Sequence, residues 1–519
     1  MTTHAAEHPP LKGSALVVGS LALSLATFMN VLDSTIANVS LPAIAGDLGA
    51  SPSQGTWVVT SFGVANAISV PLTGWLTQRF GAVRLFVASV LLFVLASWAC
   101  GLAHSLGALI VYRVVQGFVA GPMVPLSQTL LLASFPAARA GAALGLWATT
   151  TLVAPVAGPL LGGWITDNFS WPWIFYINLP IGLLAAALTW SVYRQRETER
   201  HKLPIDRIGL ILLVVGVGAL QLTLDKGHEL AWWESVEIRV LAITAVLGLI
   251  TFVVWELGDA HPVVDLRLFL HRNFTIGVLT NSLGYGLFIG NVVLLPLWLQ
   301  QYMGYSASHA GQVLAPLGLV AMVVAPVVGK HMGRLDPRML GTVAFVAYAV
   351  VFWLRSRFST DTTMWLVIVP TLLQGAAVPL FFMPIAAVTI DGLPPRRLPA
   401  ATGLANAVRM TAGAIGTSVA VVLWEDRSAL HRAHLTEQLS QGSLGLQDAM
   451  ARLQGAGLTE AAALGQLNRL IDQQAYTRGM DDVFLLSSGL FLVLIAVLWL
   501  ARRSAQPAGG ADLAASAAH

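Results

Sequence analysis

Charged residues are scarce in this sequence of 519 residues: 11% are Asp, Glu, Lys or Arg, and 56% are hydrophobic. A typical soluble domain has about 25% charged residues, so this composition excludes an ordinary soluble protein. Cys100 is the single cysteine, which excludes an intramolecular disulfide and CxxC chemistry. The sequence also lacks a GxxxxGK[ST] phosphate loop, an HExxH motif and a Cys/His cluster with metal spacing. We therefore expect neither an enzyme nor a bound metal or cofactor.

Lysine is nearly absent as well, since only four of the 29 basic residues are lysines. The net charge of +3 could indicate nucleic-acid binding in a soluble protein, but here the asymmetry of the loops explains it better. With the N-terminus inside, eighteen basic residues fall on the inside. The short outside loops hold Lys226, Arg239, Arg355 and Arg357. By the positive-inside rule, both termini (1–13 and 502–519, the latter a disordered tail) are predicted to be cytoplasmic.

Long apolar runs recur along the whole chain, and they are too uniform for the alternating strands of a β-barrel. Runs of this length predict an all-α polytopic membrane protein, because a helix satisfies its own backbone in lipid. Fourteen segments are predicted near residues 14–37, 54–76, 82–102, 106–133, 140–164, 172–193, 208–224, 238–256, 274–299, 310–329, 339–355, 364–390, 400–424 and 482–501.

The two ends of the chain echo each other. Gln116-Gly117 in the fourth segment corresponds to Gln374-Gly375 in the twelfth. Such half-repeats predict two six-helix bundles, a secondary-transporter architecture. The predicted bundles are 14–193 and 274–501. The linkers and two inserted helices occupy 194–273, and a long periplasmic loop spans 425–480. Within this loop, 458–476 is either an amphipathic helix or a simple solvated loop.

Asp33 is the only ionisable residue between Lys12 and Asp47. A carboxylate at this depth in hydrocarbon costs about 2.5–3.5 kcal/mol, so it usually has a function or a partner. A carboxyl group in a low-dielectric cavity can exchange a proton near neutral pH, which proton coupling requires. The alternative is a structural hydrogen bond to a neighbouring helix.

Arg113 and Arg409 are also predicted inside helices, where an arginine must be paired or solvated. Arg113 has Gln116 one turn along, and it would either tune the proton affinity of an acid or hold backbone carbonyls. Arg409 has no nearby acid in sequence, so a conformational role and pairing to carbonyls stay equally open.

Two further stretches have compositions typical of moving parts. The fifth segment contains small residues and prolines that allow close contact and bending; these are Pro155, Gly158, Pro159, Gly162 and Gly163. The short basic stretch 74–84 would lock one conformation or simply record topology; its candidate residues are Gly74, Arg79, Gly81 and Arg84.

A drug cavity should be apolar and aromatic with a few polar groups. For any single aromatic residue, a core or lipid-facing position is the alternative. The candidate cavity residues are Asn30, Phe62, Asn66, Gln116, Asn281, Tyr285, Phe288, Asn291, Gln374 and Phe381.

Taken together, several motifs resemble one family. LDSTIANVSLP (32–42), GWLTQRFGAVR (74–84), RVVQGFVAG (113–121) and APVAGPLLGG (154–163) are similar to the first-helix, loop, fourth-helix and antiporter motifs of fourteen-helix drug:proton antiporters of the major facilitator superfamily. Within these, the chain resembles the EmrB-like inner-membrane pumps. Two positions depart from the pattern: Gln78 stands where the loop motif has an acid, and Ala154 where the antiporter motif has glycine.

The resemblance implies a major facilitator fold and proton-driven export of hydrophobic, often cationic or weakly acidic, toxic compounds, with no cofactor. It places the essential acid at Asp33 and the fourth-helix arginine at Arg113. It also implies a bacterial inner membrane, an EmrA-like periplasmic adaptor and a TolC-like outer-membrane channel. The competing hypotheses are a narrow exporter of one endogenous metabolite or siderophore, and a non-transporting membrane sensor or scaffold, to which Gln78 gives slight support.

Overall fold

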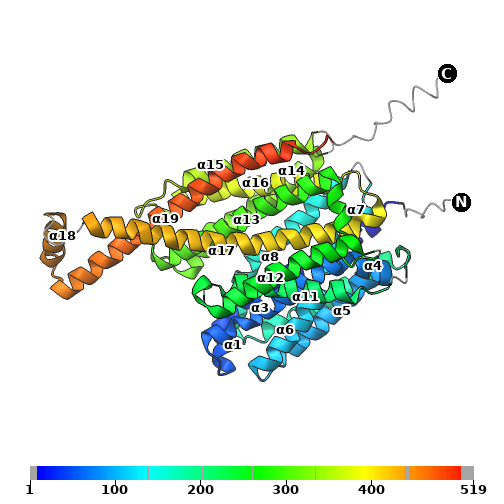
Figure 1. Ribbon diagram of the computed structural model, residues 1–519, viewed down its shortest axis with the longest axis horizontal. Helices are drawn as coiled ribbons and strands as arrows, with labels where there is room; N and C mark the ends of the chain where they lie inside the picture. Colours follow the sequence, from blue (N-terminus) through cyan, green and yellow to red (C-terminus); the bar gives the residue numbers. More distant parts are fainter. Residues whose placement is uncertain are drawn as a thin grey trace, which may run out of the picture.

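Helices make up the regular structure of the part of the chain that this computed structural model describes (Figure 1). The described residues are 9–136, 139–201, 204–227, 229–259, 261–332, 335–438 and 444–503. The predicted disordered tail therefore lies almost wholly outside the described residues. No strand occurs within these ranges.

The helices that build the bundles have the following bounds. They are α1 (Gly13–Asp47), α2 (Pro52–Gly55), α3 (Trp57–Ser69), α4 (Thr73–Phe80), α5 (Ala82–Gly101), α6 (Leu106–Ala120), α7 (Met123–Ser134), α8 (Ala140–Asn168), α9 (Trp173–Tyr176), α10 (Asn178–Tyr193), α11 (Arg207–Lys226), α12 (Val236–Gly258), α13 (Arg272–Gln301), α14 (Ala307–His331), α15 (Pro337–Arg355), α16 (Met364–Ile390), α17 (Leu398–Gln438), α18 (Leu444–Gly455) and α19 (Glu460–Trp499). Short 3-10 helices are η1 (Val70–Leu72), η3 (Trp232–Glu234), η4 (Leu266–Leu270) and η5 (Pro395–Arg397).

Thirteen helical segments in the described part are long and apolar enough to cross a membrane. Some combine two helices, because α3, η1 and α4 form one segment and α6 with α7 another. Helix α8, with 29 residues, adds a fourteenth. The prediction of fourteen membrane helices is confirmed, and the chain is a multi-pass membrane protein.

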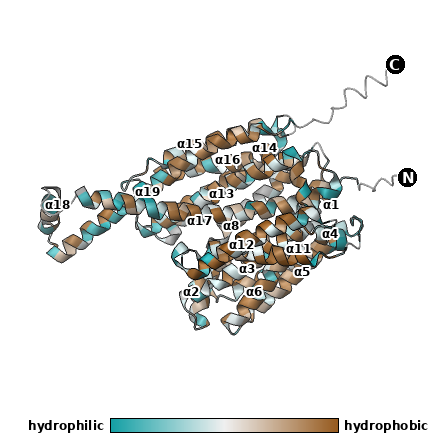
Figure 2. Cartoon of the chain, in the orientation of Figure 1, coloured by the Kyte–Doolittle hydropathy of each residue, from teal (hydrophilic) through white to brown (hydrophobic). Residues whose placement is uncertain are grey.

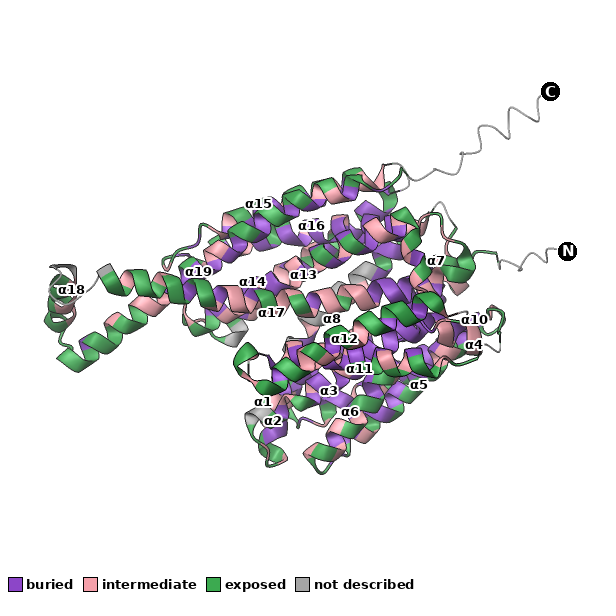
Figure 3. Cartoon of the chain, in the orientation of Figure 1, coloured by how far each residue is buried: buried purple, intermediate pink, exposed green. Residues whose placement is uncertain are grey.

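Two groups of helices pack side by side (Figure 1). In the first group α1 packs along α8, α10 and α7, and α3 packs along α6. In the second, α13 packs along α17, α16 and α19, while α15 packs along α16 and α19. Helix α11 lies against α3 and α17, and α12 packs along α11, outside both groups. Apolar residues cover the outer surfaces of these helices (Figures 2 and 3), as expected where lipid replaces water.

The segment predicted as a long loop at 425–480 is mostly helical, so that prediction is wrong in form. Helix α17 runs for 41 residues without interruption, and α19 for 40. With α18 they form a hairpin that projects beyond the bundles (Figure 1). Of the two alternatives left open for 458–476, the structure shows the helix, since residues from Glu460 onward form the first part of α19.

Arg355 was predicted in a short outside loop, and this is also wrong. It is the last residue of α15 and its side chain is completely buried. The hydropathy pattern ends the segment at this residue, and nothing in the pattern indicates that a side chain at a helix end turns inward.

The two bundles contact each other at the end of the molecule that holds both termini (Figure 1). A Cβ at Gly74 of α4 would lie 2.6 Å from Ala400 Cβ of α17, so the helices touch there without a side chain between them. Thr129 and Thr402 share a hydrogen bond of 3.1 Å across the same interface. Near it, a Cβ at Gly141 of α8 would lie 2.7 Å from the Gly329 carbonyl of α14. These contacts close the interface between the bundles at this end.

Candidate functional site

Asp33 lies on α1 inside the first bundle, and its side chain has no exposed surface. Arg113 Nη1 of α6 donates to Asp33 Oδ2 at 2.6 Å. The other carboxylate oxygen, Oδ1, accepts from Gln116 Nε2 at 3.1 Å and from Asn178 Nδ2 of α10 at 2.8 Å. Three helices therefore converge on one carboxylate, and the sequence left its partner unidentified.

Arg113 also has several buried contacts besides Asp33. Its Nε donates to the Val58 carbonyl of α3 at 3.0 Å, and Nη1 also donates to Gln116 Oε1 at 2.7 Å. The rings of Phe62 and Phe175 lie 4.2 and 5.6 Å from its guanidinium carbon. Because both charges are wholly buried, removing either one would leave the other unpaired, which typically costs about 3–5 kcal/mol.

Asn178 is a site residue that sequence reasoning missed. Besides Asp33, its Nδ2 contacts Ser97 Oγ at 2.9 Å, and Ser97 in turn donates to the Phe175 carbonyl. As with Asn30 and Asn66, the sequence shows an amide in an apolar segment, but it does not show that Asn178 reaches Asp33. The available signal was its position inside WIFYINLPIG (173–182), which is one of the stretches similar to the antiporter family.

Small residues of α8 let this helix approach α1 directly beside the acid. A Cβ at Gly158 would collide with Thr35 Oγ1, and a Cβ at Gly162 would lie 2.8 Å from Ile36 Cγ1. Gly163 is looser, with Val39 at 3.9 Å. These glycines face the first bundle itself, not the second. The side chains of Pro155 and Pro159 lie outside the described part of the structure.

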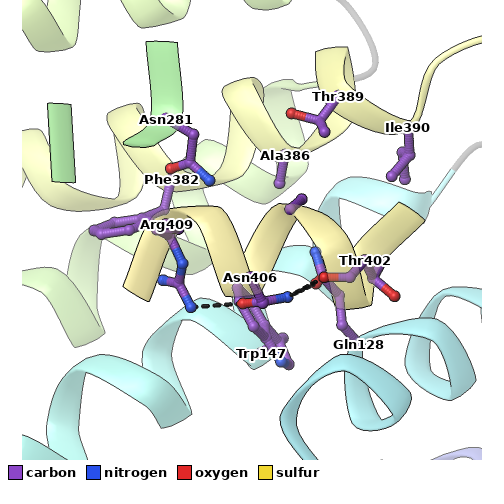
Figure 4. Close-up of a pocket in the computed structure, with 11 residues that line it drawn as sticks. Gln128, Trp147, Asn281, Phe382, Ala386, Thr389, Ile390, Thr402, Asn406 and Arg409 are labelled. Atoms are coloured by element: carbon purple, nitrogen blue, oxygen red, sulfur yellow. Dashed lines mark hydrogen bonds between the residues drawn. The ribbon is translucent and has the colours of Figure 1, made fainter. Parts of the chain in front are cut away.

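A pocket lies between the bundles, lined by α7 and α8 on one side and α13, α16 and α17 on the other (Figure 4). Its eleven lining residues include no aspartate or glutamate; they are Gln128, Trp147, Asn281, Phe382, Ala386, Thr389, Ile390, Thr402, Ala405, Asn406 and Arg409. Arg409 is the one charged residue among them, and its Nη2 donates to Asn406 Oδ1 at 2.6 Å.

Aromatic rings surround this arginine. Its guanidinium carbon lies 4.8 Å from the Tyr285 ring, 5.8 Å from Trp147 and 5.9 Å from Phe382. Trp147 Nε1 is buried and has no hydrogen-bond partner in the described structure. The pocket therefore combines a cation and ring faces with a residue, Trp147, whose donor is unpaired. The sequence left open whether Arg409 pairs with backbone carbonyls; in the structure it donates to the side-chain amide of Asn406.

The other candidate cavity residues fall into separate places. Asn281 lines the pocket and Tyr285 borders its arginine. Phe62 and Gln116 belong to the cluster around Asp33. Amide groups of the first bundle bond to carbonyls of α6; these are Asn30 to Ala120 and Asn66 to Gly117. The interior of the second bundle holds Phe288, Asn291, Gln374 and Phe381.

The stretch 74–84 is a helix end followed by a turn at Gly81, whose φ of +90° favours glycine. Glu197, from the chain after α10, accepts from the backbone N–H groups of Val83 and Arg84 at 3.0 and 2.9 Å. Arg84 Nε is 3.9 Å from the same carboxylate. Arg79 lies over the Trp75 ring at 5.6 Å. An acid distant in sequence thus caps α5.

The second bundle contains an arginine–glutamine pair of its own. Arg355 Nη2 donates to Gln374 Oε1 at 2.8 Å and to Thr371 Oγ1 at 3.0 Å, with all three side chains buried. The rings of Phe352 and Phe484 lie 5.8 and 5.9 Å from the guanidinium carbon. No ion pair joins Arg355 to a carboxylate within the described ranges.

Two helical bundles, a buried ion pair and an inter-bundle pocket together define a secondary transporter, and the sequence comparison agrees. The Major Facilitator Superfamily model matches residues 23–417. Among solved structures, the human organic anion transporter MFSD10 (TETRAN) is 15% identical with a TM-score of 0.61, covering 95% of this chain and 100% of that one. The proton:xylose symporter XylE gives 13% and 0.60, covering 94% and 96%. At these identities the structures support the fold alone.

Closer relatives define the family within that class. The multidrug export protein EmrB of Haemophilus influenzae is 49% identical over 97% of this chain and 99% of its own length. EmrB of Escherichia coli is 48% identical over the same shares. The fatty acid resistance protein FarB of Neisseria gonorrhoeae is 47% identical, again over 97% and 99%. The chain belongs to the EmrB family of the major facilitator superfamily.

Proposed function

We propose that this protein exports hydrophobic toxic compounds across the inner membrane in exchange for protons, by alternating access. The observation that carries the proposal is the wholly buried carboxylate of Asp33, paired at 2.6 Å with Arg113. The relatives named as multidrug export proteins support the class of transported compound. In this role Asp33 binds the proton, and Arg113 sets the proton affinity of Asp33.

A proton on Asp33 changes the net charge of the cluster from zero to +1, because arginine stays charged throughout. The ion pair becomes a contact between a cation and a neutral acid, and the guanidinium then needs another counter-charge or water. Uncompensated buried charges cost about 3–5 kcal/mol. This is a large part of the ~5.5 kcal/mol that converts a 1:99 population of two conformations into 99:1.

Burial also supports tight coupling. The side chains of Asp33 and Arg113 are both inaccessible to solvent in this conformation. Proton exchange with bulk water therefore requires a second conformation in which water reaches the interior of the first bundle.

We assign the cargo to the pocket between the bundles. Its rings and polar groups are of the kinds that line sites for apolar compounds with a few polar atoms. The free volume in this conformation is about 20 Å³, so the bundles must separate to admit the cargo. The contacts of Gly74 with Ala400 and of Thr129 with Thr402 separate the pocket from the terminus-bearing end. We propose that this end faces the cytoplasm, with both termini, so that the present conformation is closed on the cytoplasmic side.

The projecting hairpin of α17, α18 and α19 then lies on the periplasmic side. An EmrA-like adaptor and a TolC-like outer-membrane channel complete the proposed tripartite system. The hairpin supports such an assembly because it extends past the bundles (Figure 1).

The test is efflux by purified protein in proteoliposomes under an imposed pH gradient, with a hydrophobic dye as cargo. Asp33→Asn keeps the side-chain shape and an acceptor for Arg113 but cannot titrate. We expect the dye flux to lose its response to the gradient. The matched control is Asp47→Asn, at the far end of α1, where the carboxylate accepts from Trp171 Nε1 at 2.8 Å; it should retain the response.

Gradient-driven flux in Asp33→Asn equal to that of the unmodified protein would refute the coupling role. A panel of dyes, uncouplers and fatty acids in the same vesicles tests how many classes of compound the protein transports. Transport of a single chemical class would replace the multidrug function with a narrow exporter, and no transport of any compound would favour a sensor or scaffold.

A further inference from the structure

The arginine–glutamine pair of the second bundle has more donors than acceptors. Arg355 uses Nη2 for both of its hydrogen bonds. Its Nε and Nη1, together with Gln374 Nε2, are buried without a partner in the described structure. A hydrogen bond of 2.8 Å joins Arg355 to Gln374, so the three unpartnered donors sit on two side chains in direct contact.

The first bundle shows what such a pair holds. Arg113 Nη1 contacts Gln116 Oε1 at 2.7 Å, which is the same arginine-to-glutamine bond. There Arg113 Nη1 and Gln116 Nε2 both donate to the carboxylate of Asp33. Thus the glutamine amide accepts from the arginine with its oxygen and donates to an anion with its nitrogen. Arg113 keeps one buried nitrogen without a partner in the described structure, Nη2, whereas Arg355 keeps two, Nε and Nη1.

In the second bundle the arginine comes from a different helix. Thr371 precedes Gln374 by three residues, as Arg113 precedes Gln116. Arg355 reaches the glutamine from the end of α15 instead. The hydrogen-bond donors of Arg355 and Gln374 are therefore arranged differently from those of Arg113 and Gln116. No carboxylate among the described residues is bonded to them.

A wholly buried guanidinium without a counter-charge is unfavourable, because both its charge and its unpaired N–H groups have lost water. The neighbouring rings of Phe352 and Phe484, whose centroids are 6.0 Å apart, offer only weak compensation. A small acceptor is needed at the position that corresponds to the Asp33 carboxylate.

We propose that Arg355 and Gln374 form a binding site for a small monovalent anion of the size of chloride. The anion accepts hydrogen bonds from Gln374 Nε2 and from one free nitrogen of the Arg355 guanidinium, and it neutralises the charge of Arg355. It is a resident structural ligand, so this inference does not depend on which compound the protein exports.

The test uses the full-length protein in detergent and measures its melting temperature in chloride and in gluconate at equal ionic strength. A ligand that binds only the folded state stabilises it in a saturable manner. We expect chloride to raise the Tm by several degrees over gluconate, with bromide acting similarly. An identical Tm in all three anions would mean that water satisfies these donors, and the proposal would be wrong.

Two variants locate the effect. Gln374→Glu places a covalent carboxylate at hydrogen-bonding distance from Arg355, so the Tm should no longer respond to chloride. Arg355→Gln should lose the response as well. The control is Arg357→Gln, an exposed arginine two residues along that lies over Trp353 at 4.9 Å; its response should equal that of the unmodified protein.

If Arg355→Gln does not fold, Gln374→Glu decides alone. A chloride response that persists undiminished in Gln374→Glu overturns the site even where the unmodified protein responds. Efflux plays no part in this measurement, so failure of the anion site and failure of the transport function are distinguishable.

Discussion

Both bundles bury an arginine that donates to a glutamine oxygen, at 2.7 Å in the first and 2.8 Å in the second. In the first bundle the pair encloses Asp33, so the cluster contains a group that can titrate. In the second bundle the described partners of Arg355 are Thr371 and Gln374, and neither titrates. The comparison shows that the same polar pair occurs with a carboxylate enclosed and without one, so among the described residues the charge of the arginine is balanced in the first bundle only.

The largest expected difference comes from removing each arginine. Arg113→Gln leaves the buried carboxylate of Asp33 unpaired, which should lower the free energy of unfolding by about 3–5 kcal/mol. In gluconate buffer Arg355→Gln should cost less than half as much, because no carboxylate is left behind. Melting temperatures of the two purified variants check this.

The double variant Asp33→Asn with Arg113→Gln supplies the control. Removing both charges should restore most of the lost stability without restoring proton-driven efflux. If Arg113→Gln and Arg355→Gln were equally destabilising, the electrostatic difference between the bundles would be refuted.

The glutamines should give a smaller effect. Gln116→Leu and Gln374→Leu each remove an acceptor from a buried guanidinium, and a lost bond to a charged group is worth about 1.5–3 kcal/mol. Both variants should therefore melt earlier by similar amounts. Only Gln116→Leu should shift the pH at which efflux is half-maximal, because only Gln116 contacts an acid. Efflux measured from pH 5.5 to about 8.5 tests this, and a shift in both variants would contradict it.

Arg409 is a third buried arginine, and it belongs to the pocket between the bundles. Arg409→Gln should weaken export of a hydrophobic carboxylate about tenfold relative to its methyl ester, since one charge-assisted hydrogen bond is worth about 1.4 kcal/mol. The proton response should be unaffected. Flux ratios of acid and ester in the same vesicles give the result, with Arg409→Lys as the charge-conserving control. An unchanged ratio in Arg409→Gln would exclude contact with the acid.

The smallest effect concerns an ion pair at the start of α15, whose acid, Asp336, precedes the helix. Arg338 donates to Asp336 at 2.8 Å, and this hydrogen bond holds the pKa of Asp336 below its usual value of 3.8. A depressed carboxyl pKa adds stability above the unfolded value, and the gain disappears as pH falls through the folded value. Asp336→Asn keeps the helix cap, so its melting temperature should trail the unmodified protein slightly at pH 7, by the equivalent of about 0.2–1 kcal/mol. The gap should close below about pH 3.8.

The sequence predicted the fold well because uninterrupted apolar runs report the membrane directly. It also identified Asp33 and Arg113, since charges inside such runs are rare. It could not pair them, because their contact joins positions 80 residues apart. Asn178 escaped because the sequence does not show which of several amides in the apolar segments reaches Asp33. The buried state of Arg355 escaped because a hydropathy pattern does not show which way a side chain at a helix end turns. The same limit hid the full length of α17, where charged residues end the apolar run while the helix continues.

The length of α17 has a mechanical consequence. At 1.5 Å per residue its 41 residues extend about 60 Å, roughly twice the hydrocarbon thickness. The part outside the membrane therefore acts as a stiff lever fixed to the second bundle. Each degree by which that bundle tilts displaces the lever tip by about 0.5 Å, given an arm of about 30 Å. The stage of the transport cycle is thus converted into a displacement well beyond the lipid, where another protein can respond to it.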